Sequence, residues 1–249
     1  MNDRLPRDPL LREAMRAAEK PEPPARPFIH LRVHSAYSLL EGALQLSKIV
    51  GHAVKDETPA IAVTDTNNLF GALEFAQKAT KEGIQPIVGC QVDLLFTDEP
   101  PSTRGRRQGP DLRPVVLITA TEAGWANLVR LVSAAYLDTP PGEPIHVPTA
   151  DLKDNSDGII CLPGGPRGPI GAALRDDHGE LAESRLLTLK RLFGNRLYVE
   201  LERLAGYHRA LEAATVELAY EHALPLVATN EAFFKSREDF EAQDALIAI

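Results

Sequence analysis

A repeated alternation of short apolar runs and amphipathic segments limits the possible folds of this chain more than any other feature. Seven apolar runs follow one another from residue 28 onward: FIHLRV, PAIAVT, QPIVGCQVDLLF, PVVLITA, GIICL, RLYVEL and LPLVAT. All but the third precede a stretch with helical periodicity, at 44–55, 69–81, 122–136, 180–192, 208–222 and 239–249. Apolar runs without polar alternation are typical of strands buried on both faces, which predicts parallel strands covered by helices.

Seven such units can form either an open doubly wound sheet or a closed barrel, and periodicity alone does not choose between them. In both architectures, ligand chemistry gathers at the carboxyl ends of the strands. Polar residues stand at six of these seven ends, so we predict a crown of functional side chains there. The strand ends carry Arg32 and His34, Asp65 and Thr66, Gln91, Thr119, Pro163, Glu200 and Glu202, and Asn230 and Glu231.

The segment HLRVHSAYSLLEG at residues 30–42 raises the question of a metal site in this crown. Its two histidines, followed by a carboxylate, would suit a zinc or manganese hydrolase, because imidazole nitrogens and carboxylate oxygens match a borderline dication. Arg32 lies between the histidines, however, and an arginine stays protonated and cannot bind a cation. The segment is therefore either half of a metal site or the remnant of one.

Composition and charge exclude several classes of function. The 249 residues are 44% hydrophobic, which is enough for a full core in one large domain or two small ones. The formal net charge of -8 at pH 7 argues against a nucleic-acid surface spread over the whole chain. The basic cluster RGRRQ at 104–108, together with Arg113, is predicted to be a solvated loop.

Cysteine usage and hydropathy indicate the compartment. The two cysteines, Cys90 and Cys161, each lie in an apolar run, which predicts reduced, buried thiols. No apolar stretch approaches the roughly 20 residues that span a bilayer, and the charged start is unlike a signal peptide. We therefore expect a soluble, cytoplasmic protein without a membrane partner.

The two ends of the chain differ from its middle. Residues 1–26 end in PEPPARP, and this proline-rich composition predicts a flexible N-terminal extension before a domain at 27–249. The last segment, FEAQDALIAI, stops within a helical pattern and has no glycine cap, so we expect a piece of a longer protein.

Two other features have plain structural interpretations. The segment GGPRGPIG at 164–171 lacks the Lys-Ser/Thr of a phosphate-binding P-loop, so we predict a tight turn. Trp125, Leu128 and Leu131 have helical spacing, which predicts packing in the core.

Three long segments carry a resemblance to a known family. HLRVHSAYSLLEGA, AIAVTDTNNLFGALEFAQKATKEGIQPIVGCQVDL and LPLVATNEAFF resemble the N-terminal PHP domain (polymerase and histidinol phosphatase domain) of the bacterial replicative DNA polymerase III alpha subunit. They occur in the family's order, and the resemblance extends from about Phe28 to the last residue. The resemblance implies a distorted seven-stranded (β/α)7 barrel. Of the two architectures that periodicity allows, it therefore favours the closed barrel over the open sheet.

The resemblance also implies a crown that has lost its metal. Metal-binding members carry His-x-His, an Asp before a glycine, a His after Thr-Asp, a Glu after a glycine and an Asp-x-His near the end. In those places this chain has Arg32 and His34, Glu41, Asp65 with Thr66, Gln91, and Glu231 with Phe233. Gln and Thr are weak neutral ligands, Phe is none, and Arg repels a cation. We therefore predict a vestigial crown with neither a metal ion nor catalytic residues.

A specific role for Arg32 follows from this comparison. We predict that its guanidinium supplies the positive charge that a metal once gave, and that it pairs with Asp65, Glu231 or a neighbouring acid.

The function implied by the resemblance belongs to a longer protein. That protein would be a DNA-directed DNA polymerase, a nucleotidyltransferase of DNA replication that uses Mg²⁺ bound by palm carboxylates beyond this chain. The domain itself is predicted to be inactive and to serve as a structural platform. It would dock the proofreading exonuclease subunit within the polymerase III holoenzyme, while DNA is contacted mainly through downstream domains.

Two alternatives remain. The domain could be a metal-dependent phosphoesterase or a proofreading 3′-5′ exonuclease, or it could be a free-standing PHP phosphatase for a small phosphate ester. Both alternatives predict an intact metal crown.

Overall fold

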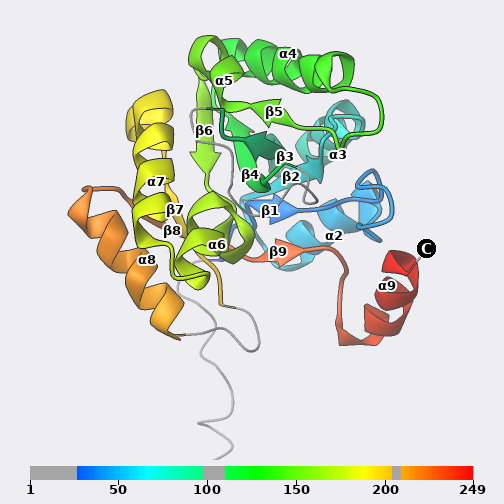
Figure 1. The fold of residues 1–249 in the computed structure, drawn as a ribbon. Helices are drawn as coiled ribbons and strands as arrows, with labels where there is room; N and C mark the ends of the chain where they lie inside the picture. Colours follow the sequence, from blue (N-terminus) through cyan, green and yellow to red (C-terminus); the bar gives the residue numbers. More distant parts are fainter. Residues whose placement is uncertain (1–26, 98–109, 204–208, 249) are drawn as a thin grey trace, which may run out of the picture.

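The computed structural model describes residues 27–97, 110–203 and 209–248. The flexible extension predicted at 1–26 and the basic loop predicted at 104–108 lie outside these ranges. In the described part, the strands lie in the middle, with α4 and α5 above them, α2 and α3 on one side, and α7 and α8 on the other (Figure 1).

Short strands make up the centre of the molecule. They are β1 (Arg32–Val33), β2 (Ala60–Thr66), β3 (Gln85–Leu95), β4 (Leu112–Thr119), β5 (Val147–Pro148), β6 (Ile159–Leu162), β7 (Val199–Leu201), β8 (Leu226–Ala228) and β9 (Glu231–Ala232). β2, β3, β4 and β6 form one sheet in that order, with β5 pairing only with β3. β7 pairs with β8, and β1 pairs with β9.

Single contacts join these sheets into a ring. Cys161 of β6 bridges to Leu197, and the Tyr198 amide donates to the Cys161 carbonyl, so β6 is joined to β7. β9 follows β8 after two residues and pairs with β1, and the Ala62 amide of β2 donates to the His30 carbonyl beside β1. Counting β8 and β9 as one interrupted strand, seven strands of the described chain close on themselves. The predicted distorted seven-stranded barrel is confirmed.

One strand runs against the prediction of parallel strands. β4 is antiparallel to both of its neighbours, β3 and β6. Its apolar sequence reflects burial on both faces, and such burial does not depend on the direction of the strand. Thr119 therefore lies at the end of the barrel opposite to the crown, where its hydroxyl donates to the Val88 carbonyl. Arg113 and Pro114, at the start of β4, take the corresponding place at the crown.

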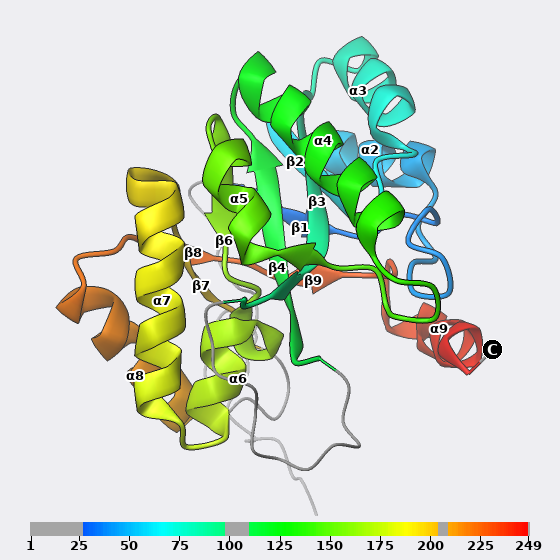
Figure 2. The same ribbon diagram turned by 45° about the horizontal axis from the view of Figure 1, so that its top comes forward.

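The helices lie around the outside of the strands, with the last one, near the C-terminus, apart from the barrel (Figure 2). They are α2 (Leu46–Lys55), α3 (Ala72–Lys81), α4 (Glu122–Asp138), α5 (Thr149–Asn155), α6 (Pro169–Arg175), α7 (Gly179–Phe193), α8 (Arg209–Glu221) and α9 (Phe240–Ile247). Short 3₁₀ helices are η1 (Gly165–Arg167), η2 (Gly194–Arg196) and η3 (Arg237–Asp239). Within the described ranges, no helix combines the length and the apolar character needed to cross a membrane.

Six of these helices were predicted from periodicity, but α5 and α6 were not. Each has only seven residues, and α6 begins within the glycine- and proline-rich segment that was predicted as a tight turn. The turn is present, as η1 follows Gly164, whose φ is 76°, but a helix continues from it. Pro169 at its first position supplies a preset φ and lacks only an N–H that would have had no partner in the helix.

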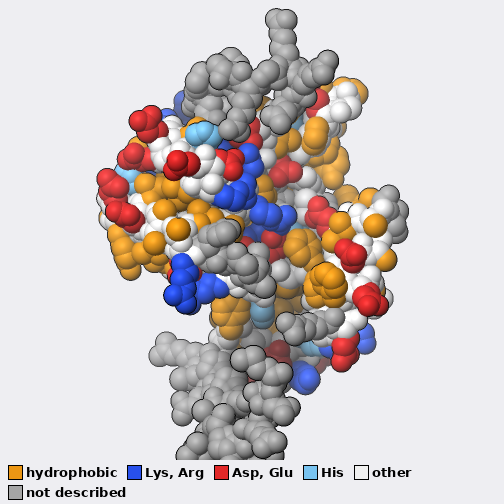
Figure 3. Space-filling model, turned by 60° about the horizontal axis from the view of Figure 1, so that its bottom comes forward, with side chains coloured by type: hydrophobic (Ala, Val, Ile, Leu, Met, Phe, Trp, Pro, Cys, Tyr) orange, Lys and Arg blue, Asp and Glu red, His pale blue; other side chains and the backbone are white. Residues whose placement is uncertain are grey.

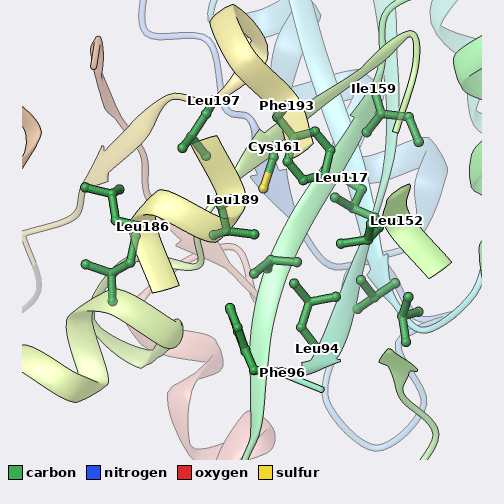
Figure 4. Close-up of a cluster of buried hydrophobic side chains, with 14 of the residues drawn as sticks. Leu94, Phe96, Leu117, Leu152, Ile159, Cys161, Leu186, Leu189, Phe193 and Leu197 are labelled. Atoms are coloured by element: carbon green, nitrogen blue, oxygen red, sulfur yellow. The ribbon is translucent and has the colours of Figure 1, made fainter. Parts of the chain in front are cut away.

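The largest hydrophobic cluster lies between the strands and the helices α4 to α7 (Figure 4). Labelled members include Leu117 and Cys161 from the strands and Leu186, Leu189 and Phe193 from α7. The predicted burial of Cys90 and Cys161 as free thiols is confirmed.

The prediction for Trp125 was wrong, while that for its two neighbours was right. Leu128 and Leu131 are buried, but 42% of the Trp125 surface is exposed. Trp125 stands in the first turn of α4, and the helix turns it away from the strands that bury the two leucines.

Two glycines set the approach of α4 to the sheet. Gly124 lies in the first turn of α4, and a Cβ placed there would be 2.0 Å from the carbonyl oxygen of Gly158, just before β6. The same oxygen accepts a hydrogen bond from the Ala120 amide at 2.8 Å. The close contact therefore joins β4, α4 and β6.

We expect Gly124→Ala to lower the free energy of unfolding by about 2 kcal/mol. The added methyl group would collide with the Gly158 carbonyl, which its hydrogen bond to the Ala120 amide holds in place. Gly51→Ala is the matched control, because Gly51 lies in α2 with no atom within 4 Å of the added Cβ. It should raise stability by up to about 1 kcal/mol through helix propensity. Urea unfolding of both variants checks this, and equal effects would contradict the packing interpretation.

Candidate functional site

A buried guanidinium occupies the centre of the barrel mouth. Arg32 of β1 has no exposed surface. Its Nη2 atom lies 2.8 Å from Oε1 of Glu231, and its Nη1 atom lies 3.4 Å from Oε1 of Glu200 and 3.6 Å from Oε2 of Glu202. Nη2 also donates to Oε1 of Gln91 at 2.9 Å. A charge removed from water needs such partners, and three carboxylates surround this one.

The strand pairing brings these groups together. Arg32 stands opposite Glu231 in the parallel pair of β1 and β9, and Glu200 lies in β7. Further donors satisfy the acids: Thr229 Oγ1 donates to Glu200, and the Glu231 amide donates to Glu202. The mouth is therefore a hydrogen-bonded network rather than an isolated ion pair.

The predicted pairing of Arg32 with Glu231 is confirmed, but Asp65 is not one of its partners. Asp65 accepts hydrogen bonds from the Ser35 amide at 2.6 Å, from the Ser35 hydroxyl at 2.7 Å and from the Ser38 hydroxyl at 2.7 Å. Through these three hydrogen bonds, the Asp65 carboxylate of β2 holds the loop that follows β1.

The environment changes the acidities in opposite directions. Burial alone would lower the pKa of Arg32, but the charges of Glu200, Glu231 and Glu202 raise it. Burial raises the pKa of Glu200 above its ordinary value, with Arg32 opposing the shift. Burial alone would also raise the pKa of Glu231, but the hydrogen bond from His34 and the charges of Arg32 and Arg167 hold it at about 2. Glu231 is thus the firmly ionised member.

His34 links Glu231 to the neighbouring loop. Its Nε2 atom lies 3.0 Å from Oε1 of Glu231, and its Nδ1 atom lies 3.1 Å from Oγ of Ser38. This order of serine, histidine and acid resembles a hydrolase triad. The Ser38 hydroxyl, however, donates to Asp65 and has no exposed surface, so it cannot attack a substrate.

The remaining predicted crown residues join the same network. Phe233 stacks on the His34 ring with centroids 4.3 Å apart, and Thr66 donates to Glu41 at 2.6 Å. Thr66 Oγ1 also lies 3.3 Å from His34 Nδ1. All eight predicted positions therefore meet at one end of the barrel, as residues 32, 34, 41, 65, 66, 91, 231 and 233 are connected by the contacts described above.

Sequence reasoning missed several members of the site. Arg167 of η1 pairs with Oε2 of Glu231, and its guanidinium carbon lies 6.0 Å from the centroid of the Phe233 ring. It stands in the segment interpreted only as a turn. Ser35 and Ser38 were visible as a hydroxyl cluster beside His34, but nothing in their spacing indicated Asp65 as their common acceptor.

The residues at the mouth do not fit a divalent metal ion. In the described ranges, no group of three or more His, Cys, Asp and Glu side chains has an arrangement that could hold one. The Glu231 oxygens face Arg32, His34 and Arg167, and the Glu200 and Glu202 oxygens that approach Arg32 are engaged by its Nη1. A dication among these acids would lie beside a fixed positive charge, which opposes its binding.

A pocket of about 430 Å³ opens beside this network. Its lining consists of Glu41, Thr66, Gln91, Asp93, Arg113, Pro114, Arg167 and Arg175. Burial and the nearby Glu41 raise the pKa of Asp93, while Arg167 and His146 oppose the shift. The pocket shares Glu41, Thr66 and Gln91 with the predicted crown, and adds three arginines to it.

Comparison with known proteins gives consistent matches. A family model described as the PHP domain matches residues 30–204. The chain is 42% identical over 225 residues to DNA polymerase III subunit alpha of Caulobacter vibrioides, and 35% identical over 227 residues to the protein of the same name from Borreliella burgdorferi. Each alignment covers 89% of this chain but 19% of the relative, so the chain spans less than a fifth of their length.

A solved structure is similar in fold. An amidohydrolase from Chromobacterium violaceum superposes with a TM-score of 0.54 at 15% identity, covering 88% of this chain and 96% of that protein. At this level of identity, the similarity concerns the fold alone.

Removal of the central charge should be strongly destabilising. We expect Arg32→Met to lower the free energy of unfolding by about 3–5 kcal/mol near pH 8, because Glu200 and Glu202 lose their counter-charge and Glu231 loses one of its two arginine partners. In the unsubstituted protein, the depressed pKa of Glu231 contributes stability above its unfolded pKa, and this is lost as pH falls toward 2. In the variant the acids can be neutralised by protonation, so the loss should shrink between pH 8 and pH 5.

Urea unfolding at both pH values measures this difference. Arg130→Met is the control, since the hydrogen bonds that Arg130 makes within the described ranges, to Asn127 and Asn155, are exposed. A loss for Arg32→Met that is the same at pH 8 and pH 5 would argue against uncompensated carboxylates as its cause.

Proposed function

The chain belongs to the PHP domain family, and on this premise we propose that it is the N-terminal domain of a bacterial DNA polymerase III alpha subunit. The support is its 42% identity over 225 residues to a protein of that name. The longer protein would be a DNA-directed DNA polymerase, a nucleotidyltransferase of DNA replication in the cytoplasm. Its Mg²⁺-binding carboxylates and most of its DNA contacts would lie in downstream domains.

Within that protein, the domain would be a metal-free structural platform with a vestigial crown. The observation that carries this proposal is the buried Arg32 guanidinium among Glu200, Glu202 and Glu231. A working metal crown keeps its acids free for the ion, whereas here they neutralise a fixed cation of the chain itself.

The geometry explains what such a crown would do for the barrel. β1 and β9 pair through only two residue positions, and β7 and β8 through three. Arg32 contacts acids from β7, β9 and the segment after β7, so its charge joins strands that share few backbone hydrogen bonds. The charge would hold the ring closed where the sheet is weakest, as a metal ion bound to several strands would.

The proposed partner is the proofreading exonuclease subunit of the polymerase III holoenzyme. Four large exposed apolar side chains lie on two adjoining segments, and a group of this kind is a physical mark of a docking surface. Leu39, Leu40, Phe70 and Leu73 are 72%, 57%, 64% and 71% exposed. The two segments that carry them adjoin, since the Asn68 side chain donates to the Tyr37 carbonyl and Tyr37 Oη to Glu74. Leu40 also has a positive φ of 64°, an unfavourable conformation for an exposed leucine.

The alternative function is that of a metal-dependent phosphoesterase or proofreading 3′-5′ exonuclease of the PHP family. The pocket at the barrel mouth favours it, because a substrate could reach the crown there. The ion pairs of Arg32 count against it, since they occupy the acids that such chemistry would need.

Metal analysis separates the two functions. After exposure to zinc and manganese and dialysis without chelator, we expect less than about a tenth of an equivalent of metal by mass spectrometry, because the acids of the mouth face guanidinium groups. The melting temperature should not change on addition of EDTA. Two or three tightly held equivalents, together with metal-dependent hydrolysis of a phosphodiester, would favour the alternative.

Partner binding tests the platform role. We expect the purified exonuclease subunit of the same organism to form a stoichiometric complex with the chain in calorimetric titration. Leu39→Ser/Phe70→Ser should weaken that complex at least about tenfold, through loss of apolar contact area. Tyr220→Ser is the control, since Tyr220 is 70% exposed on α8, on the opposite side of the molecule from α3 (Figure 1). Equal affinities for the double variant and the control would place the binding surface elsewhere.

A further inference from the structure

The outer side of α4 carries an apolar stripe. Trp125, Val129 and Tyr136 are 42%, 38% and 49% exposed, and Val132 lies between them at the edge of the core. Their spacing of four, three and four residues places the four side chains within about 60° of one another around the helix. Two helices that pack as a coiled coil meet through residues with this spacing. These four residues are called the α4 seam below.

The surroundings of the α4 seam suit a second helix. Figure 2 shows α4 along its whole length on the outside of the molecule. Ala126 and Ser133 are exposed on the solvent side of the seam, and such small side chains let another backbone come close. From Trp125 to Tyr136 the seam is about 16 Å long. An apolar stripe of this length on an exposed helix is typical of a packing surface.

A helix of matching length is encoded in the chain itself. Residues 9–20, PLLREAMRAAEK, lie outside the described ranges, but their sequence has a helix start in Asp8 and Pro9 and a stop in Pro21. A helix over 9–20 would be about 18 Å long. Its apolar residues share one face and its charged residues the other; the apolar ones are Leu10, Leu11, Ala14, Met15, Ala17 and Ala18. So short a helix is marginal alone in water, and it needs an apolar surface to form.

The connection to the barrel is long enough for this contact. The His30 carbonyl accepts from the Ala62 amide near the start of β2, so the chain enters the barrel at the end opposite to the crown. α4 begins at that same end, just after Thr119. Three strand spacings and one layer of helices separate the two points by about 18 Å. The proline-rich residues 21–26 span about 19 Å when extended.

The point of entry also decides the direction of packing. Lys20, at the end of the segment next to the tether, would lie near Glu122 at the start of α4, so the two helices would run antiparallel. This arrangement sets apolar residues with the same spacing opposite one another: Ala18 at Trp125, Met15 at Val129 and Leu11 at Val132. The smallest residue of one helix then faces the largest of the other, as close packing requires.

The charges are complementary. The chain has a formal net charge of -8, and acidic side chains are visible on both sides of the face that is turned forward in Figure 3. Residues 4–20, in contrast, carry five basic and three acidic side chains. In the antiparallel arrangement, Lys20 would lie near Glu122 and Arg7 near Asp138. Exposed pairs of this kind are weak, and they favour one direction of packing more than they add affinity.

The size of the α4 seam favours a tethered segment over a second copy of the chain. Four side chains on each partner cover much less than the roughly 1,200 Å² of total surface that stable interfaces between separate proteins bury. A segment joined to the barrel by a short tether needs less contact area, because its effective concentration is in the millimolar range.

We propose that residues 9–20 form an amphipathic helix that packs antiparallel on the α4 seam, with residues 21–26 as its tether. The helix covers the exposed parts of Trp125, Val129 and Tyr136. The inference is independent of the polymerase assignment, because it rests on the surface and the sequence of this chain alone.

Fluorescence of the full chain tests the proposal, because Trp125 is its single tryptophan. Leu11→Ser/Met15→Ser removes apolar contacts from the segment and lies outside the described barrel. We expect this double variant to raise the acrylamide quenching constant of Trp125 at least about twofold and to shift its emission to longer wavelength, since the indole becomes exposed to water.

A matched double variant is the control. Arg12→Ser/Glu13→Ser changes two residues on the charged face of the same segment and keeps the net charge, so quenching and emission should stay as in the unsubstituted chain. Equal quenching in the two double variants would overturn the proposal. Quenching of the unsubstituted chain that falls as protein concentration rises about a hundredfold would also overturn it, because a second copy would then be the partner that covers Trp125.

Discussion

The interaction on which the rest of the site depends is the burial of one guanidinium among three carboxylates. Arg32 has no exposed surface, and its contacts reach Glu200, Glu202 and Glu231. Neither partner would be tolerated alone, because an isolated buried charge is costly on the scale of total protein stability. The mutual neutralisation offsets the cost of a polar interior at the barrel mouth. It also joins strands that pair over only two or three residue positions.

The same charge organises the groups around it. The Gln91 amide oxygen accepts a hydrogen bond from Arg32, and this contact fixes the orientation of the amide. The charges of Arg32 and Arg167 help to lower the pKa of Glu231, which keeps that acid ionised between them. Arg32 lies fully buried in this mouth, whereas Arg113, Arg167 and Arg175 line the pocket beside it. The buried charge would serve the stability of the fold, as a fixed cation in the place that the resemblance assigns to a bound one.

How much of this could be predicted differs from one residue to another. The eight crown positions follow from motifs in the sequence, and the pairing of Arg32 with Glu231 follows from the need to match a buried charge. The partners of Asp65 could not be predicted, because the sequence offers several acids as acceptors for the same donors. The conformation of the loop after β1 decides that Ser35 and Ser38 donate hydrogen bonds to Asp65. Arg167 was missed because its segment was interpreted by its glycines. Trp125 was misplaced because helical spacing indicates which residues share a face, and not how far the neighbouring strands extend to cover it.

By itself, the sequence determined the alternation of strands and helices, the places of the crown residues and the family, because these depend on local apolar periodicity and on motifs that are continuous in the chain. Only the tertiary structure decided the direction of β4, the closure of the ring through single bridges and the meeting of Arg113, Arg167 and Arg175 at one pocket. The physical reason is that burial on both faces leaves the same apolar pattern in a strand whichever way it runs. The direction is set instead by hydrogen bonds with partners distant in the sequence, and these bonds decide which end of β4, and which charges, reach the mouth.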